Sequence, residues 1–219
     1  GGGGGGGGSP RIQVRRKRKI MRRAMQAPMM RSSLPLLNRG RGCSSATFHV
    51  GSWLRMLRPG APWVAPYVPT APDVALQLLS LARLAPGETM CDLGCGDGRM
   101  LSLAVHHFGA ARAIGYELDE ELAASARNSA AGDQRIEVRC EDFFESAAVV
   151  IAEADVVALY LSETGNSQLL PLLRENLRPT ARVVSNVWEM PVPATKTLRA
   201  KGSFVPLHLF EHADLMGDS

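Results

Sequence analysis

The chain has 219 residues, of which 45% are hydrophobic and 21% charged, a composition that excludes a fibrous or wholly disordered protein. It contains no run of 18 apolar residues, which excludes a membrane-spanning helix, and its four cysteines form no Cys-x-x-Cys pair and no metal-ligand spacing. The net charge of +4 is unevenly distributed: residues 1–72 hold 13 lysines and arginines and no acid, whereas residues 73–219 hold 12 basic and 21 acidic residues.

The acid-free N-terminal region is typical of a targeting presequence, a disordered tail or a nucleic-acid contact. Its scattered serine, leucine and methionine residues favour the presequence, so we expect a mitochondrial protein, with a plastid or cytoplasmic location as alternatives. We divide the chain into a basic targeting or tail region at residues 1–59, a proline-rich linker at residues 60–72, and one domain at residues 73–219.

A glycine-rich loop follows the first strand expected in the domain. A helix is expected at residues 73–84, then a short apolar strand at residues 89–93, the loop with Gly94, Gly96 and Gly98, and a helix at residues 99–108. Such a loop brings a ligand close to the backbone and to a helix N-terminus, which indicates a nucleotide-type cofactor. The dinucleotide fingerprint fails because Arg99 or Leu101 stands where a third small residue is needed, and no Gly-Lys-Ser/Thr follows for a phosphate loop.

Strands and helices alternate through the rest of the domain. A second strand at residues 111–116 ends at Glu117, where an acid can accept ribose hydroxyl protons, and the next helix, at residues 118–131, has Asp119 as its N-cap. Further strands are expected at residues 135–139, 154–161 and 182–187, a helix at residues 168–177, and a last, antiparallel strand at residues 205–210. This order predicts an α/β, Rossmann-like, doubly wound and mostly parallel sheet.

The sequence Asp-x-Gly-x-Gly-x-Gly at residues 92–98 resembles motif I of the class I S-adenosylmethionine-dependent methyltransferases. Together with Pro-Tyr-Val-Pro-Thr at residues 66–70 and Gly-Tyr-Glu-Leu-Asp at residues 115–119, it resembles the small mitochondrial lysine methyltransferases that act on ATP synthase c-subunit and adenine nucleotide translocase, and their bacterial single-domain relatives. The resemblance covers residues 64–212 and implies the class I methyltransferase fold.

The resemblance also implies S-adenosylmethionine as the cofactor and no metal. By the family's pattern, Tyr67 and Thr70 fold over the methionine end of the cofactor, Asp142 meets the adenine amino group, and Phe143 packs on the adenine ring. The full set of cofactor-binding residues expected in this way is Tyr67, Thr70, Asp92, Gly94, Cys95, Gly96, Asp97, Gly98, Glu117, Asp142 and Phe143.

Protein-lysine methylation is the activity that the resemblance favours. Tyr67, Tyr160 and Trp188 are candidates for an aromatic acceptor entrance, and Glu163 is a candidate for orienting the amine, because all but Tyr67 stand near expected strand ends. The acidic domain suits a lysine-bearing protein partner better than a stably bound nucleic acid, and we expect a monomer. Two alternatives remain open: methylation of RNA or a small molecule, and a non-catalytic protein that binds S-adenosylmethionine and assists assembly.

Overall fold

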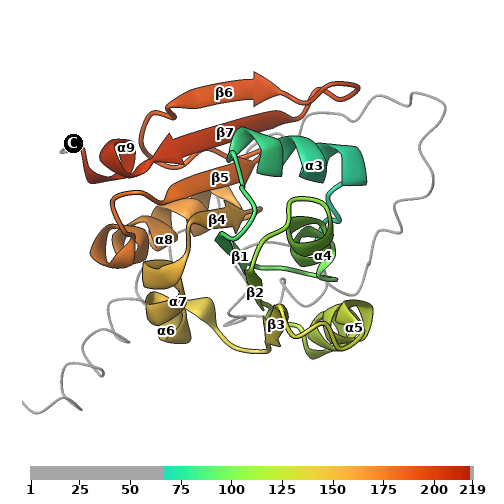
Figure 1. The fold of residues 1–219 in the computed structure, drawn as a ribbon. Coiled ribbons are helices and arrows are strands. Elements are labelled where there is room, and N and C mark those ends of the chain that lie inside the picture. Colours follow the sequence, from blue (N-terminus) through green and yellow to red (C-terminus); the bar gives the residue numbers. More distant parts are fainter. Residues whose placement is uncertain (1–66, 218–219) are drawn as a thin grey trace, which may run out of the picture. The chain divides into compact units, whose positions relative to one another are not determined.

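The computed structural model describes residues 67–217. Its centre is a seven-stranded sheet in the order β3-β2-β1-β4-β5-β7-β6 (Figure 1). Strands β1 to β5 pair in parallel, and β7 runs antiparallel to both β5 and β6. The strands are β1 Thr89–Leu93, β2 Arg112–Tyr116, β3 Ile136–Arg139, β4 Val156–Leu159, β5 Arg182–Asn186, β6 Lys196–Arg199 and β7 Pro206–Glu211. This confirms the predicted doubly wound, mostly parallel fold.

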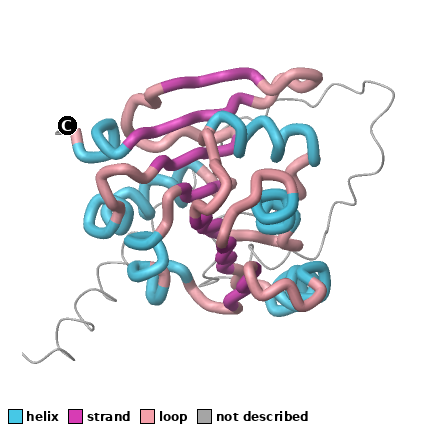
Figure 2. The backbone as a smooth tube through the Cα atoms, viewed as in Figure 1, coloured by secondary structure: helices cyan, strands magenta, loops and turns pink. Residues whose placement is uncertain are grey.

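Helices cover both faces of the sheet (Figure 2). On one side lie α3 Pro72–Leu81, α4 Arg99–His106 and α5 Glu120–Ala130; on the other lie α6 Phe143–Ser146, α7 Ala148–Glu153, α8 Glu163–Asn176 and α9 His212–Met216. Two hydrophobic clusters fill the space between the sheet and the helices on its two faces. One includes residues of α3 and α4, and the other includes residues of α7 and α8. Because both faces are covered, the central strands are largely buried, and all four residues of β4 are apolar and buried.

The register of the parallel strands brings their carboxyl ends to one edge. Leu93 at the end of β1 pairs with Tyr116 of β2 and with Leu159 of β4, and Leu159 pairs with Ser185 of β5. The residues that follow these strands therefore meet at the edge where open α/β sheets bind their ligands.

Several elements differ from the sequence prediction, and the short helices α6, α7 and α9 were not expected. The helix expected to begin at Gln168 begins at Glu163, because Ser162 is its N-cap and accepts a hydrogen bond of 3.0 Å from the backbone N–H of Gly165. Strand β6 was not expected, since its four exposed residues form no apolar run. The predicted cap of α5 is confirmed: the Asp119 carboxylate accepts the N–H groups of the helix's first turn.

Within the described range, every helix is too short or too polar to cross a lipid bilayer.

Candidate functional site

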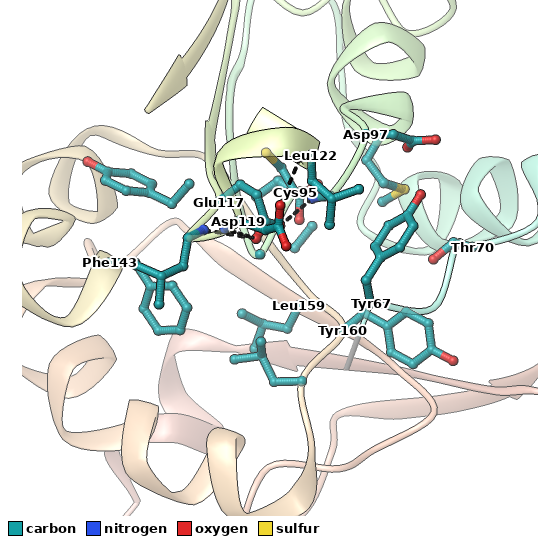
Figure 3. A pocket seen from close by; sticks show the side chains of 18 of the residues that line it. Tyr67, Thr70, Cys95, Asp97, Glu117, Asp119, Leu122, Phe143, Leu159 and Tyr160 are labelled. Carbon is teal, nitrogen blue, oxygen red and sulfur yellow. Dashed lines mark hydrogen bonds between the residues drawn. The ribbon is translucent and has the colours of Figure 1, made fainter. Parts of the chain in front are cut away.

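A cleft opens at the carboxyl edge of the sheet and encloses about 1100 Å³, part of it open to solvent. In the close view, Phe143 lies at one end, Tyr67, Thr70 and Tyr160 lie at the other, and Glu117 lies between them (Figure 3). The segments that form its walls are residues 67–70 and the ends of β1, β2, β4 and β5 with the residues after them, together with residues 141–144.

The glycine loop is folded tightly against its neighbours. The N–H groups of Gly94 and Cys95 both donate to the carbonyl oxygen of Tyr116, at 2.8 and 2.9 Å, and tie the loop to β2. Gly96 has a φ of +56°, and a Cβ at this position would lie 2.4 Å from Cε2 of Tyr67. Position 96 therefore requires glycine both for its backbone conformation and because the Tyr67 ring packs directly on it.

Glu117 is a buried carboxylate fixed by backbone donors. Its Oε2 accepts the N–H of Gly96 at 2.8 Å, and its Oε1 accepts the N–H groups of Leu118 at 2.8 Å and Asp119 at 2.9 Å. Burial raises its pKa, and these three hydrogen bonds oppose that rise. Because a carboxylate offers about four acceptor positions, roughly one remains for a ligand hydroxyl.

Asp92, the first residue of the glycine motif, is 5% exposed and lines the cleft. Burial, followed by the negative charges of Glu117 and Asp97, raises its pKa to about 7. No described residue donates a hydrogen bond to its carboxylate. A cation placed in the cleft would favour its ionised form.

Residues 67–70, which we name the strap, form the wall at one end of the cleft. The Arg99 guanidinium holds this strap to the glycine loop: Nε donates to Oδ1 of Asp97 at 2.9 Å, Nη2 donates to Oδ2 of Asp97 at 2.5 Å, and Nη1 donates to the carbonyl oxygen of Thr70 at 2.8 Å. From the other side, Nδ2 of Asn186 donates to Oγ1 of Thr70 at 3.2 Å. The strap is thus fixed both to the loop after β1 and to the end of β5.

The Tyr67 hydroxyl interacts with Asp97, and burial and that negative charge raise the pKa of Tyr67 to about 12. Burial also raises the pKa of Tyr160. Both side chains line the cleft and are neutral near pH 7, so they can donate hydrogen bonds but cannot act as bases there.

Asp142 and Phe143 both line the cleft, and Phe143 lies at the end opposite Tyr67. Asp142 is the N-cap of α6, and its Oδ1 accepts the N–H of Phe144 at 2.9 Å. The Phe143 ring packs on that of Phe144, with their centroids 4.5 Å apart. An aromatic face beside a carboxylate can receive a flat heterocycle that carries an amino group.

Two of the acceptor-side candidates lie outside this cleft. Glu163 is in the first turn of α8, and it shares a separate, shallow depression with Trp188, Glu189 and His208. The sequence placed Glu163 at a strand end only because the start of α8 was set five residues too late.

Arg99 and Asn186 line the cleft but were missed by the sequence prediction, as were the acids Asp119 and Glu141. Arg99 was noted only as a misfit to the dinucleotide fingerprint. Its charged side chain at the start of α4, directly after the glycine loop, was the sequence signal that could have identified it as a residue of the site. Asn186 gave no local signal. It is 2% exposed, lines the cleft, and its Oδ1 has no hydrogen-bond partner among the described residues.

Of the remaining predicted positions, all but Gly98 line the cleft. Gly94, Cys95, Gly96 and Asp97 all line the cleft, and Gly98 is the N-cap of α4 with a φ of +79°. The three described cysteines, at positions 91, 95 and 140, are free thiols. Among the described residues, no three His, Cys, Asp or Glu side chains cluster so that they could hold a metal ion.

Comparisons with known proteins agree with this geometry. The model of the ANTKMT methyltransferase domain matches residues 92–196. A protein-lysine N-methyltransferase of Saccharolobus islandicus is 37% identical over 130 residues, which are 57% of this chain and 78% of the archaeal protein. The adenine nucleotide translocase lysine N-methyltransferase of Mus musculus is 33% identical over 144 residues, which are 64% of this chain and 62% of the mouse protein.

Among solved structures, an RNA methyltransferase from Salinibacter ruber in complex with S-adenosyl-L-homocysteine aligns with a TM-score of 0.60 and 34% identity. The alignment covers 66% of this chain and 93% of the bacterial one. The chain therefore belongs to the class I S-adenosylmethionine-dependent methyltransferases, in the family of the ANTKMT methyltransferase domain.

Proposed function

We propose that this enzyme is a protein-lysine N-methyltransferase. The observation that carries the proposal is the charge of the cleft, which six acidic side chains and one basic side chain line: Asp92, Asp97, Glu117, Asp119, Glu141 and Asp142 against Arg99. Such a lining attracts a cationic acceptor chain and repels the phosphates of a nucleic acid. The archaeal and mouse relatives, whose names state lysine methylation, support the same acceptor class.

The residues of the cleft fit S-adenosylmethionine. We place the adenine against Phe143 with its amino group toward Asp142, the ribose beside Glu117, and the methionine part between the glycine loop and the strap. The free acceptor position of Glu117 suits a ribose hydroxyl, and the acidic lining suits a sulfonium. When bound, S-adenosylmethionine supplies an electrophilic methyl group on that sulfonium.

The acceptor side of the site is the end of β4 with Tyr160, which lies at the same end of the cleft as Tyr67. Methyl transfer is an in-line displacement, so alignment of the nucleophile supplies much of the acceleration. A lysine must arrive as a neutral amine, and a partly buried, aromatic entrance lowers its pKa. Since both tyrosines stay protonated, we assign them to orienting the acceptor rather than to removing its proton. Glu163 and Trp188 are not in this set because they line the neighbouring depression.

The full chain, incubated with tritiated S-adenosylmethionine and extracts of cells that lack the protein, should transfer label to a protein band. Hydrolysis of that band should release methyl-lysine. Label in RNA or in small solutes would overturn the lysine assignment and leave the cofactor assignment standing. Cofactor binding without any labelled product would favour the non-catalytic alternative.

Two glycine substitutions serve as a matched pair in that assay. Gly96→Ala should reduce labelling roughly tenfold or more, because its Cβ would collide with the Tyr67 ring and overpacking costs about 1–3 kcal/mol. Gly87→Ala also places alanine at a positive φ, of +86°, but its Cβ meets nothing within 4 Å, so labelling should stay near that of the native chain. Equal effects of the two would remove Gly96 from the site.

We also propose that residues 1–59, which we call the basic arm, direct the protein to mitochondria. The acid-free composition of residues 1–59 supports this, and that region lies outside the described residues. The proposal is tested with a fusion of residues 1–66 to a fluorescent protein, which should localise to mitochondria. Fluorescence spread through the cytoplasm would contradict it.

A further inference from the structure

Arg99 is the single basic side chain among the described residues that line the cleft. S-adenosylmethionine carries three charged groups in its methionine part: a sulfonium, an ammonium and a carboxylate. The acidic lining suits the two cations but opposes the carboxylate, which needs a positively charged donor to offset the surrounding acids.

The position of Arg99 matches that need. Its guanidinium contacts Asp97 and the Thr70 carbonyl, which places it at the strap end of the cleft, away from Phe143. Its side chain is 34% exposed. A guanidinium has five N–H donors; Asp97 and Thr70 engage three of them, and at least one remains even when the Tyr67 hydroxyl takes a fourth.

A second feature points the same way. Arg99 is the first residue of α4, and its backbone N–H approaches Oδ1 of Asp97 only at 3.3 Å. The first turn of a helix favours an anion. Guanidinium and helix terminus thus act on the same small region beside the glycine loop.

We propose that Arg99 binds the carboxylate of S-adenosylmethionine. This assignment rests on the placement of the cofactor proposed above. It accounts for an arginine at the position where dinucleotide-binding proteins place a small residue: the third small residue serves close helix–strand packing, whereas here a charged donor reaches back over the loop to the strap. Arg99 then has two tasks, holding the strap and holding the carboxylate.

The test must separate those two tasks. Binding of S-adenosylmethionine and of decarboxylated S-adenosylmethionine to the full chain is measured by isothermal titration calorimetry. The two ligands share adenosine, sulfonium and amine and differ in the carboxylate. The native chain should prefer S-adenosylmethionine by about 10- to 100-fold, as expected for a charged hydrogen bond. Arg99→Met should remove that preference, and Arg99→Lys should keep part of it.

Loss of Arg99 also leaves Asp97 unpaired, and its charge would itself repel a carboxylate. The double variant Arg99→Met/Asp97→Asn removes that charge and should still show no preference for S-adenosylmethionine. Arg112→Met is the control, since Arg112 pairs with Glu137 at the start of β2, outside the cleft, and its substitution should change neither affinity.

An equal loss of both ligands in Arg99→Met and in the double variant would show that Arg99 only holds the strap, and would overturn the proposal. A native chain that binds both ligands equally would overturn it as well. If the native chain binds neither ligand, the cofactor placement itself is wrong, which is a distinct result from a change confined to Arg99.

Discussion

At the scale of a single residue, the carboxyl of Asp92 holds its proton more tightly than an ordinary aspartate does. Its pKa of about 7, against an ordinary value of 3.8, means that the folded protein keeps a proton on this carboxyl through a range of pH where the unfolded chain has lost it. The cause is burial beside Glu117, which the cleft requires if both acids are to face a cationic ligand. The buried carboxyl of Asp92 therefore lowers the free energy of unfolding, and a bound cation would offset this loss of stability.

The stability of the ligand-free protein should fall as pH rises from 5 to 7.5. In this range the folded state binds more protons than the unfolded state, and the contribution of Asp92 to the free energy of unfolding declines by on the order of 2–3 kcal/mol, at about 1.4 kcal/mol per pH unit. Urea unfolding at several pH values measures this. Asp92→Asn is the control and should flatten the decline; an equally steep decline in that variant would assign the effect to other groups.

At the scale of elements, the turn after β5 is strained. Val187 has a φ of +70°, which is rare for a β-branched residue, and the N–H of Trp188 donates to the carbonyl oxygen of Asn186 at 2.9 Å across it. Neighbouring side chains hold the turn: Nδ2 of Asn166 donates to the carbonyl oxygens of Trp188 and Glu189 at 3.0 and 3.1 Å. The strain lies next to Asn186, which fixes the strap.

Val187→Gly should stabilise the protein by up to about 2.5 kcal/mol. Relief of a strained backbone conformation is worth about 1–3 kcal/mol, and the entropy of glycine in the unfolded chain removes about 0.5–1 kcal/mol of it. Thermal or urea unfolding checks this. Val205→Gly, at a partly buried valine with an ordinary negative φ, should destabilise. A loss of stability in Val187→Gly as large as in the control would show that no strain is stored at the turn.

The elements that could be predicted from the sequence are those with local signals. Apolar runs marked the parallel strands, alternating glycines marked the loop after β1, and Asp119 marked the start of α5. The start of α8 was missed because the short segment after β4 was interpreted as part of the strand end. The contacts that build the strap could not be predicted at all: Thr70 is 29 residues from Arg99 and 116 from Asn186, and no local pattern links such pairs.

At the scale of the whole molecule, charge separates two parts of the chain. Residues 73–219 include nine more acidic than basic residues, and the side chains that line the cleft are likewise mostly acidic. The isolated sequence already indicated a basic acceptor from the domain's net charge, but only the structure places six acids in the cleft itself. Long-range attraction of this kind acts on the rate of encounter and weakens with salt.

At low ionic strength, poly-L-lysine should therefore either inhibit labelling of the natural acceptor or become labelled in its place. Poly-L-glutamate and polyuridylate should do neither. The tritium-transfer assay measures this directly, and the effect should fade as sodium chloride rises from about 0.05 to about 0.5 M. Poly-L-glutamate tests sensitivity to negative charge in general. Inhibition by polyuridylate alone would point to a nucleic-acid acceptor and contradict the proposed function.

The strap has a practical consequence for how deletions of this protein are interpreted. A fragment trimmed to residues 73–219, the domain boundary that composition suggests, would retain all seven strands and nearly every helical residue described above. It would lack Tyr67 and Thr70, so one end of the cleft would have no wall. A folded but inactive fragment of that length would then report a missing wall, and not a requirement for the basic arm. A start at or before residue 66 separates the two explanations.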